Sequence, residues 1–391
     1  MIAYLTDVEG RWDKVESFAA GNPHVWLEGT SLRLADGVSF VFGGDSVDRG
    51  AHGRRILTML VEARRAYGDR VVLLAGNRDI NKLRLARELA GAPPAKAPVD
   101  VSRAELLRWI FSETMGAPKA FEYRRAELAA GGAAADDDAV VDSFVEDVRP
   151  GGLVLAYLQH AQLGHRAGST LFVHGGVCRD NLFVTPDAPD VSDVEAWLAA
   201  LHRFYTGELA AFVAGRPPTA LIAYQAPKPG THLNQASVVY ARPTDEDGNP
   251  HLPEPEVIAR LRDNGIDRVV VGHTPSGDCP AVLHDGGFEL VLGDNSYARL
   301  ELGSQLAFTD ELTSVHATTE LGGTRHAIAG EIRRGDRQGP LGRRDGDTGQ
   351  LVKARLADGR YLLFRGLPGH QVEQLPTPAD ELARRRLVLA T

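Results

Sequence analysis

Gly44-Asp45-Ser46-Val47-Asp48-Arg49-Gly50 comes directly after the apolar run 38–42 and its glycine. Four other short apolar runs are also followed by residues that can bind metals. They are 2–5 before Asp7 and Glu9, 71–75 before Asn77, 171–173 before His174, and 269–271 before His273. Short runs rich in β-branched residues are typical of strands buried on both faces. Since open α/β sheets place their sites outside the carboxyl ends of the strands, we expect these side chains along one sheet edge.

Carboxylates, a carboxamide and imidazoles together form a ligand set for hard or borderline divalent cations. Taken singly, Asp45, Asp48 and Asn77 would be ordinary turn residues, and His174 an ordinary core histidine. Their shared position after strands favours a site for two metal ions.

The later motifs are Gly76-Asn77-Arg78-Asp79, Val173-His174-Gly175-Gly176 and Gly272-His273-Thr274-Pro275. In this order the motifs resemble those of the calcineurin-like metallophosphoesterases, on the side of that superfamily nearest the phosphoprotein phosphatases. The resemblance covers roughly residues 1–297, with a poor match over 90–168. It implies an α/β protein with a four-layer α/β/β/α sandwich.

The resemblance also implies roles for individual side chains. Asp7 and Glu9 would hold the first metal, Asp45 would bridge both metals, and Asn77, His174 and His273 would complete the second. A metal-bridging hydroxide would then attack phosphorus in line.

Further residues would serve the substrate. Arg49 matches the position that clamps its phosphate, and Arg242, in Val238-Val239-Tyr240-Ala241-Arg242-Pro243, would bring a second guanidinium. Asp48 is expected to orient a ligand or Arg49 rather than to bind metal.

Two positions depart from the family pattern. Glu9 stands where the pattern has histidine, and the added carboxylate favours manganese, iron or magnesium over zinc. Arg78 replaces the histidine of the Asn-His block. An arginine cannot give up a proton, but it can bind phosphate and stabilise developing charge. Asp79 or a metal-bound water would then have to give a proton to the leaving oxygen, unless the leaving group is acidic enough to need none. Asp79 could also orient Arg78.

The composition agrees with a cytoplasmic enzyme. The 391 residues are 43% hydrophobic, which is enough for a large core. The net charge of −9 argues against binding to nucleic-acid duplexes. No run resembles a membrane span or signal peptide, and Cys178 and Cys279 suggest neither a disulfide framework nor a thiolate metal site. The oligomeric state stays open.

The regions outside the motifs are assigned more coarsely. We expect a catalytic domain over 1–325, a helical insertion over 90–168 and a small β-rich appendage over 326–391. Within the insertion, Arg103–Met115 has helical spacing and 131–138 has the composition of a mobile loop. The insertion is interpreted either as a lid or specificity cap, or as a decorative helical hairpin. The remaining assignments are a core helix over 191–214, a closing strand ending at Leu292-Gly293-Asp294-Asn295-Ser296, and a hairpin around Asp358-Gly359.

The expected activity is hydrolysis of phosphomonoesters by two divalent ions, with Mn or Fe first and Mg or Zn possible. The single histidine of Gly272-His273-Thr274-Pro275 favours monoesters, since many phosphodiesterase branches have two. The preferred substrate is a small phosphorylated metabolite or nucleotide, and a phosphoprotein is the alternative. A hypothesis of another class, motivated by Glu9 and Arg78, is a catalytically weak module that binds a phosphorylated ligand.

Overall fold

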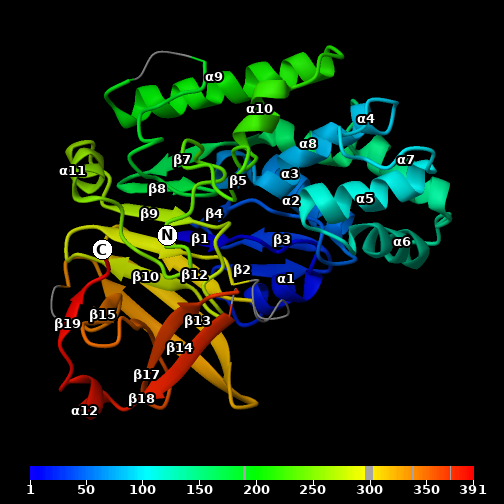
Figure 1. The fold of residues 1–391 in the computed structure, drawn as a ribbon. Coiled ribbons are helices and arrows are strands. Elements are labelled where there is room, and N and C mark those ends of the chain that lie inside the picture. Colours follow the sequence, from blue (N-terminus) through cyan, green and yellow to red (C-terminus); the bar gives the residue numbers. More distant parts are fainter. Residues whose placement is uncertain (188–190, 296–302, 337–338, 370) are drawn as a thin grey trace.

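Two β-sheets form the centre of the molecule (Figure 1). The computed structural model describes residues 1–187, 191–295, 303–336, 339–369 and 371–391. The first sheet contains, in order across it, β14 (Thr324–Arg333), β13 (Leu312–Leu321), β12 (Gln305–Phe308), β1 (Ile2–Leu5), β4 (Ser39–Phe42), β5 (Val71–Leu74) and β6 (Ala161–Gln162). The second contains β10 (Ala281–His284), β11 (Glu289–Leu292), β9 (Arg268–Val271), β8 (Thr170–Val173) and β7 (Gly164–Ala167).

The two sheets pack face to face through large apolar side chains. Tyr4 and Val41 of the first sheet share one buried cluster with Phe172 and Val270 of the second. The rings of Tyr4 and Phe172 stack with centroids 5.8 Å apart. Both faces of each central strand are therefore buried, which explains the continuous apolar runs of the sequence.

Helices cover the outer faces of both sheets and give the expected four layers. Helix α2 packs on β5 and on α8, and α9 packs on β7 and on α10. The outer helices are α1 (Trp12–Ala19), α2 (Gly53–Tyr67), α3 (Asn77–Ile80), α8 (Leu153–His160), α9 (Val194–Val213), α10 (Thr219–Tyr224) and α11 (Pro255–Asp263). A separate two-stranded ribbon consists of β2 (Val25–Glu28) and β3 (Ser31–Leu34).

All five apolar runs are strands, as predicted, but they belong to two sheets. Strands β1, β4 and β5 are parallel neighbours in the first sheet, and β8 and β9 are parallel neighbours in the second. The predicted single sheet edge is thus wrong. The polar residues come from the carboxyl ends of two facing sheets, so they surround a site from both sides instead of lining it in one row.

The insertion is a helical unit with its own core. It consists of α4 (Leu85–Glu88), α5 (Arg103–Met115), α6 (Ala120–Ala130) and α7 (Asp137–Asp147), which lie together at one side in Figure 1. Leu107, Phe111 and Phe121 belong to this second core. Its end was predicted too late, because Tyr157 of α8 packs in the main core and donates to the Leu74 carbonyl at 2.5 Å.

The end of the stretch 131–138 is the start of a helix, which was not predicted. Asp136 accepts a hydrogen bond from the Ala139 N–H and caps α7, whose first turn contains Asp137 and Asp138. An acidic run at a helix start is stabilised by the free N–H groups and by the helix dipole.

The C-terminal region forms a third sheet. Its strands in order are β18 (Gln371–Thr377), β17 (Tyr361–Leu367), β16 (Leu351–Arg355), β15 (Arg343–Asp345) and β19 (Leu387–Leu389), with α12 (Ala379–Leu382) before the last strand. The predicted hairpin around Asp358-Gly359 is confirmed as β16 and β17. The predicted start at 326 is too early, because β14 pairs with β13 along its whole length.

The third sheet contacts the loop that follows β9. The buried Lys353 ammonium of β16 donates to the Ser276 carbonyl in this loop. The closing strand expected before Asp294 is β11, and Ser296 lies outside the described residues. None of the described helices has the length and apolarity needed to traverse a lipid bilayer.

Candidate metal centre

The loops that leave the strands have an unusual backbone. Among the described residues, seven other than glycine have a positive φ, and five of them are Asp7, Glu9, Asp45, Asp48 and His273. This left-handed region is unfavourable for residues with a Cβ, and such strain clusters at functional sites. The fold therefore holds these five predicted site residues in conformations that the local sequence would not choose.

Glycines allow the loops to approach one another closely. A Cβ on Gly76 would overlap Asp45 Oδ1 and the Asp45 nitrogen, and one on Gly272 would overlap Asp7 Oδ2. Since no side chain fits at either position, these glycines are needed to bring the site residues together.

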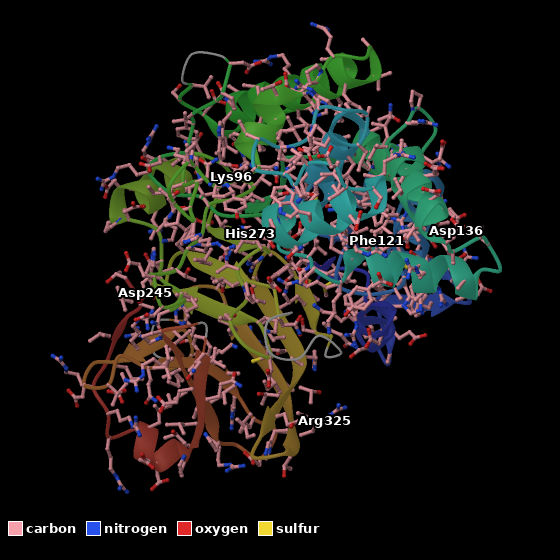
Figure 2. All side chains as sticks on the ribbon, turned by 45° about the vertical axis from the view of Figure 1, so that its right-hand side comes forward. Lys96, Phe121, Asp136, Asp245, His273 and Arg325 are labelled. Atoms are coloured by element: carbon pink, nitrogen blue, oxygen red, sulfur yellow. The ribbon has the colours of Figure 1, made fainter. Side chains whose placement is uncertain are left out.

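Four of the predicted ligands converge. Asp45, His174 and His273 offer ligand atoms that all lie within 4.8 Å of one another, the one such group of histidine, cysteine or acidic side chains in the described part of the chain. Asn77 lies among them, with its Oδ1 3.2 Å from His174 Nε2 and 2.8 Å from His273 Nδ1. His174 Nε2 is also 3.4 Å from Asp45 Oδ1. Figure 2 labels His273 near the middle of the molecule.

These spacings fit a single divalent cation. With metal–ligand bonds of about 2.1 Å, neighbouring ligands are separated by about 3.0 to 3.4 Å in octahedral or tetrahedral sites. The two His174 distances of 3.2 and 3.4 Å lie in this range, and the 2.8 Å between Asn77 and His273 is shorter. His174 Nδ1 lies 2.7 Å from the Gly43 carbonyl, which fixes the proton of the neutral ring on that nitrogen. Nε2 then presents a lone pair to the oxygens of Asn77 and Asp45. Electron-pair donors that face one another in a buried site repel unless a cation lies between them.

Asp7 is held close to this group by backbone contacts. Its two oxygens lie 3.2 and 3.1 Å from the His273 N–H, and Oδ2 accepts from the Thr6 hydroxyl at 2.5 Å. Burial, with the nearby Asp294 and Asp45, raises the pKa of Asp7 well above its usual range. Asp7 therefore links β1 to the loop after β9.

Glu9 does not join the four converging donors. Its Oε1 lies 2.8 Å from Arg78 Nε and 3.5 Å from Arg49 Nε, whereas its Oε2 is buried with no hydrogen-bond partner among the described residues. Arg78 Nε is also 3.5 Å from Asp45 Oδ2. Burial opposes the charge of Arg78, but Glu9, Asp45 and Asp48 hold its pKa above the usual value. The two departures from the family pattern are thus partners in one ion pair.

Asp48 has a different partner from the predicted Arg49. It accepts from Lys82 Nζ at 2.6 Å, and Arg78 Nη1 lies 3.7 Å away. Lys82 Nζ also donates to the Arg78 carbonyl at 2.9 Å and to Asn81 Oδ1 at 2.7 Å. Burial lowers the pKa of Lys82, although Asp48 favours its charged form.

Asp79 points away from Arg78 and towards the backbone. Its oxygens accept from the N–H groups of Asp45, Ser46 and Gly76, each at 2.9 Å, and from the Ser46 hydroxyl at 2.6 Å. Burial, with the charge of Asp45, raises its pKa to about 6. Asp79 therefore ties the loop after β4 to the start of α3.

Arg242 reaches the site from the loop before α11. Its Nη1 lies 3.5 Å from the His273 carbonyl, and its guanidinium lies 5.8 Å from the Tyr240 ring centroid. Burial, with the charge of Arg242 and His174 beside it, lowers the pKa of His273 well below its usual value. The neutral ring is the form that binds metals.

Two buried lysines of the site, Lys82 and Lys14, were not predicted from the sequence. Lys82 follows Arg78 by four positions, which would place both on one face if the helix begun at Asn77 continued. Lys14, whose Nζ donates to the Asp7 carbonyl at 2.7 Å, lies beside the apolar stripe of α1. Nothing in its local pattern distinguishes it from a surface lysine.

Comparison with known proteins agrees with the motifs. A family model described as calcineurin-like phosphoesterase matches residues 2–277. No curated protein sequence matches the chain. One similar solved structure is a protein serine/threonine phosphatase from Saccharomyces cerevisiae with similarity to human phosphatase PP5. It is 13% identical, the match covers 78% of this chain and 71% of that one, and the TM-score is 0.41. Because the family model spans well over half of the sequence, this chain belongs to the calcineurin-like phosphoesterase family.

Proposed function

We propose that this chain is a metal-dependent phosphatase that hydrolyses phosphomonoesters. The observation that carries the proposal is the convergence of Asp45, Asn77, His174 and His273 beside the buried guanidinium of Arg78. A divalent cation held by these donors supplies Lewis acidity towards water and towards phosphoryl oxygens.

The nature of the ion follows from the donors. Two imidazole nitrogens with two oxygens suit borderline cations, so Mn²⁺ and Fe²⁺ are proposed first, with Mg²⁺ and Zn²⁺ as the other candidates. Two ions are what the family resemblance predicts, whereas the four converging donors provide for one.

The arginines at the site bind the phosphate group in this proposal. Arg49 has a side chain that is 37% exposed, and Arg242 lies against the loop of His273. Their planar guanidinium groups can each donate two hydrogen bonds to phosphoryl oxygens, which orients the substrate and offsets its charge.

A cleft beside Arg49 is where we place the part of a small substrate that extends beyond its phosphate; the four converging donors are not in its lining. Its volume is 530 Å³, within the range of small-molecule sites. Arg11 and Trp12 line one part of it, and Tyr123 of the helical insertion lines another. Because the insertion limits the space next to Arg49, a phosphorylated metabolite or nucleotide fits this arrangement better than the surface of a folded phosphoprotein.

The first experiment measures hydrolysis of p-nitrophenyl phosphate by the full chain with added Mn²⁺. Asp45→Asn should lower kcat by about 100-fold or more, because even residues that only support metal ligands contribute 10- to 100-fold. Asp380→Asn is the matched control, since this carboxylate is 74% exposed in the C-terminal region. Its activity should equal that of the unmodified chain, and equal activity in Asp45→Asn would contradict the proposal.

The alternatives predict other results. A phosphoprotein phosphatase would prefer phosphoserine peptides to phosphorylated metabolites and nucleotides in a substrate panel. A phosphodiesterase would prefer bis(p-nitrophenyl) phosphate to the monoester. A binding module would bind Mn²⁺ and inorganic phosphate but turn over none of these compounds.

A further inference from the structure

We propose that the chain binds one divalent cation, and that the Arg78 guanidinium takes the place of the other cation that its family pattern implies, the one assigned to Asp7, Glu9 and Asp45. The inference rests on the proposed function, because it concerns the same site. It assigns Glu9 to Arg78 instead of to a metal ion.

The first argument is the position of the guanidinium. The first metal that the family resemblance implies would be bound by Asp7, Glu9 and Asp45. In the structure, Arg78 Nε lies 2.8 Å from Glu9 Oε1 and 3.5 Å from Asp45 Oδ2, and Nη1 lies 3.7 Å from Asp48 Oδ2. A cation already bridges the carboxylates after β1 and β4, and it is covalently part of the protein.

Asp7, the other carboxylate assigned to that ion, already has hydrogen-bond partners in the protein. The Asp7 carboxylate faces the His273 N–H and accepts from the Thr6 hydroxyl. The other Glu9 oxygen, Oε2, has no hydrogen-bond partner in the part of the chain that the structure describes. A second divalent ion bound there would lie next to a buried positive charge, whose repulsion is strong in a low-dielectric site.

The two residues that depart from the family pattern, Glu9 and Arg78, carry opposite charges and are partners. A histidine is expected at both position 9 and position 78, and the chain has a glutamate and an arginine. Either substitution alone would leave a buried charge without its nearest partner, which is destabilising. Together they form an ion pair whose net charge is zero, like the neutral imidazoles that they replace.

The fourth argument is that Arg78 is fixed at its backbone as well as at its guanidinium. Its N–H donates to Asp45 Oδ1 at 2.8 Å, and its carbonyl accepts from Lys82 Nζ at 2.9 Å. The Arg78 side chain is only 10% exposed, and Nη1 also donates to the Met115 carbonyl of the insertion at 3.4 Å. A guanidinium held from three sides is a fixed part of the site, as a bound ion would be.

The test is the metal stoichiometry of the full chain. Equilibrium dialysis against Mn²⁺, followed by elemental analysis, should give one ion per chain. The double variant Glu9→His with Arg78→His restores the family pattern and should bind two. Arg103→His is the matched control, because this arginine is 47% exposed on the insertion, and it should bind one.

Electron paramagnetic resonance of the Mn²⁺-loaded unmodified chain gives an answer even if the double variant does not fold. An isolated ion shows the hyperfine spectrum of a single Mn²⁺, whereas ions about 3.5 to 4 Å apart show an exchange-coupled spectrum. Two ions per unmodified chain, or a coupled spectrum, would overturn the inference. So would a folded double variant that still binds one.

The results also separate this inference from the proposed function. One ion per chain with no turnover of any phosphoester would support the inference and contradict the proposed phosphatase function. Two ions per chain with turnover would contradict the inference and support the proposed phosphatase function.

Discussion

Arg78 combines burial, charge and three acidic neighbours, so its replacement should be costly. Arg78→Met removes the nearest partner of Glu9, whose carboxylate is itself buried. Breaking a buried ion pair from one side typically costs about 3 to 5 kcal/mol. We expect a loss of that size in the free energy of unfolding of the metal-free chain, measured by urea denaturation.

The control for this substitution is Arg103→Met on the exposed surface of the insertion. It should change the free energy of unfolding by less than about 0.5 kcal/mol. Equal stabilities of the two variants would show that the Glu9–Arg78 pair is not a buried, mutually dependent unit.

The properties of Arg78 and Asp79 also bear on whether the leaving oxygen receives a proton from the protein. An arginine keeps its proton, and Asp79, whose pKa of about 6 would suit a proton donor, is 1% exposed and directed at backbone N–H groups. Without a general acid, kcat should depend strongly on the acidity of the leaving alcohol. Phenyl phosphate should be hydrolysed about 100-fold more slowly than p-nitrophenyl phosphate at saturation. Similar rates would reveal a proton donor that this account lacks.

Asp79 connects the loop after β4 to the start of α3. Because the pKa of Asp79 is raised, the stability of this junction should depend on pH. The ordinary pKa of 3.8 is raised to about 6 in the folded chain. The folded state therefore favours the protonated form, and this stabilisation is present below pH 4 and lost as the pH rises through 6. The resulting contribution to the free energy of unfolding is on the order of a few kcal/mol.

Asp79→Asn tests this linkage because asparagine does not titrate. Urea denaturation with chelator present should show the unmodified chain losing stability relative to Asp79→Asn between pH 4 and pH 7, by up to about 3 kcal/mol. A difference between the two proteins that stays constant with pH would contradict the assignment.

The insertion is attached to α2 through a capping interaction. His52, at the N-cap of α2, makes no side-chain cap, but Glu127 of α6 accepts from the Arg54 and Arg55 N–H groups at 2.9 and 3.2 Å. Glu127→Ala should cost about 1 kcal/mol and speed amide exchange in the first turn of α2, while exchange in α9 stays unchanged. Unchanged exchange in α2 would mean that the insertion is held by other contacts.

Much of the fold was predictable from the sequence, because strand identity and motif order are local properties. The run before Asp45 is apolar on both faces, and the same holds before His174 and His273, so β4, β8 and β9 follow directly. Their distribution over two sheets does not follow, since it depends on which strands pair across long separations.

The same distinction holds for the site and for the domain boundaries. Asp45, Asn77, His174 and His273 could be grouped by their order, whereas the pairing of Glu9 with Arg78 depends on side chains that cross between two loops. Lys14 and Lys82 gave too little signal because burial of a lysine is decided by tertiary packing. Strand β14 was assigned to the appendage because its partner β13 fixes its place only through sheet register.

The most direct test of the whole account is a crystal structure of the full chain grown with Mn²⁺, with the anomalous signal of manganese used to locate the ion. The account predicts one peak within about 2.2 Å of Asp45, Asn77, His174 and His273, with Arg78 still on Glu9. An anomalous peak at another position, or four side chains that point apart with no ion among them, would contradict the proposed metal centre.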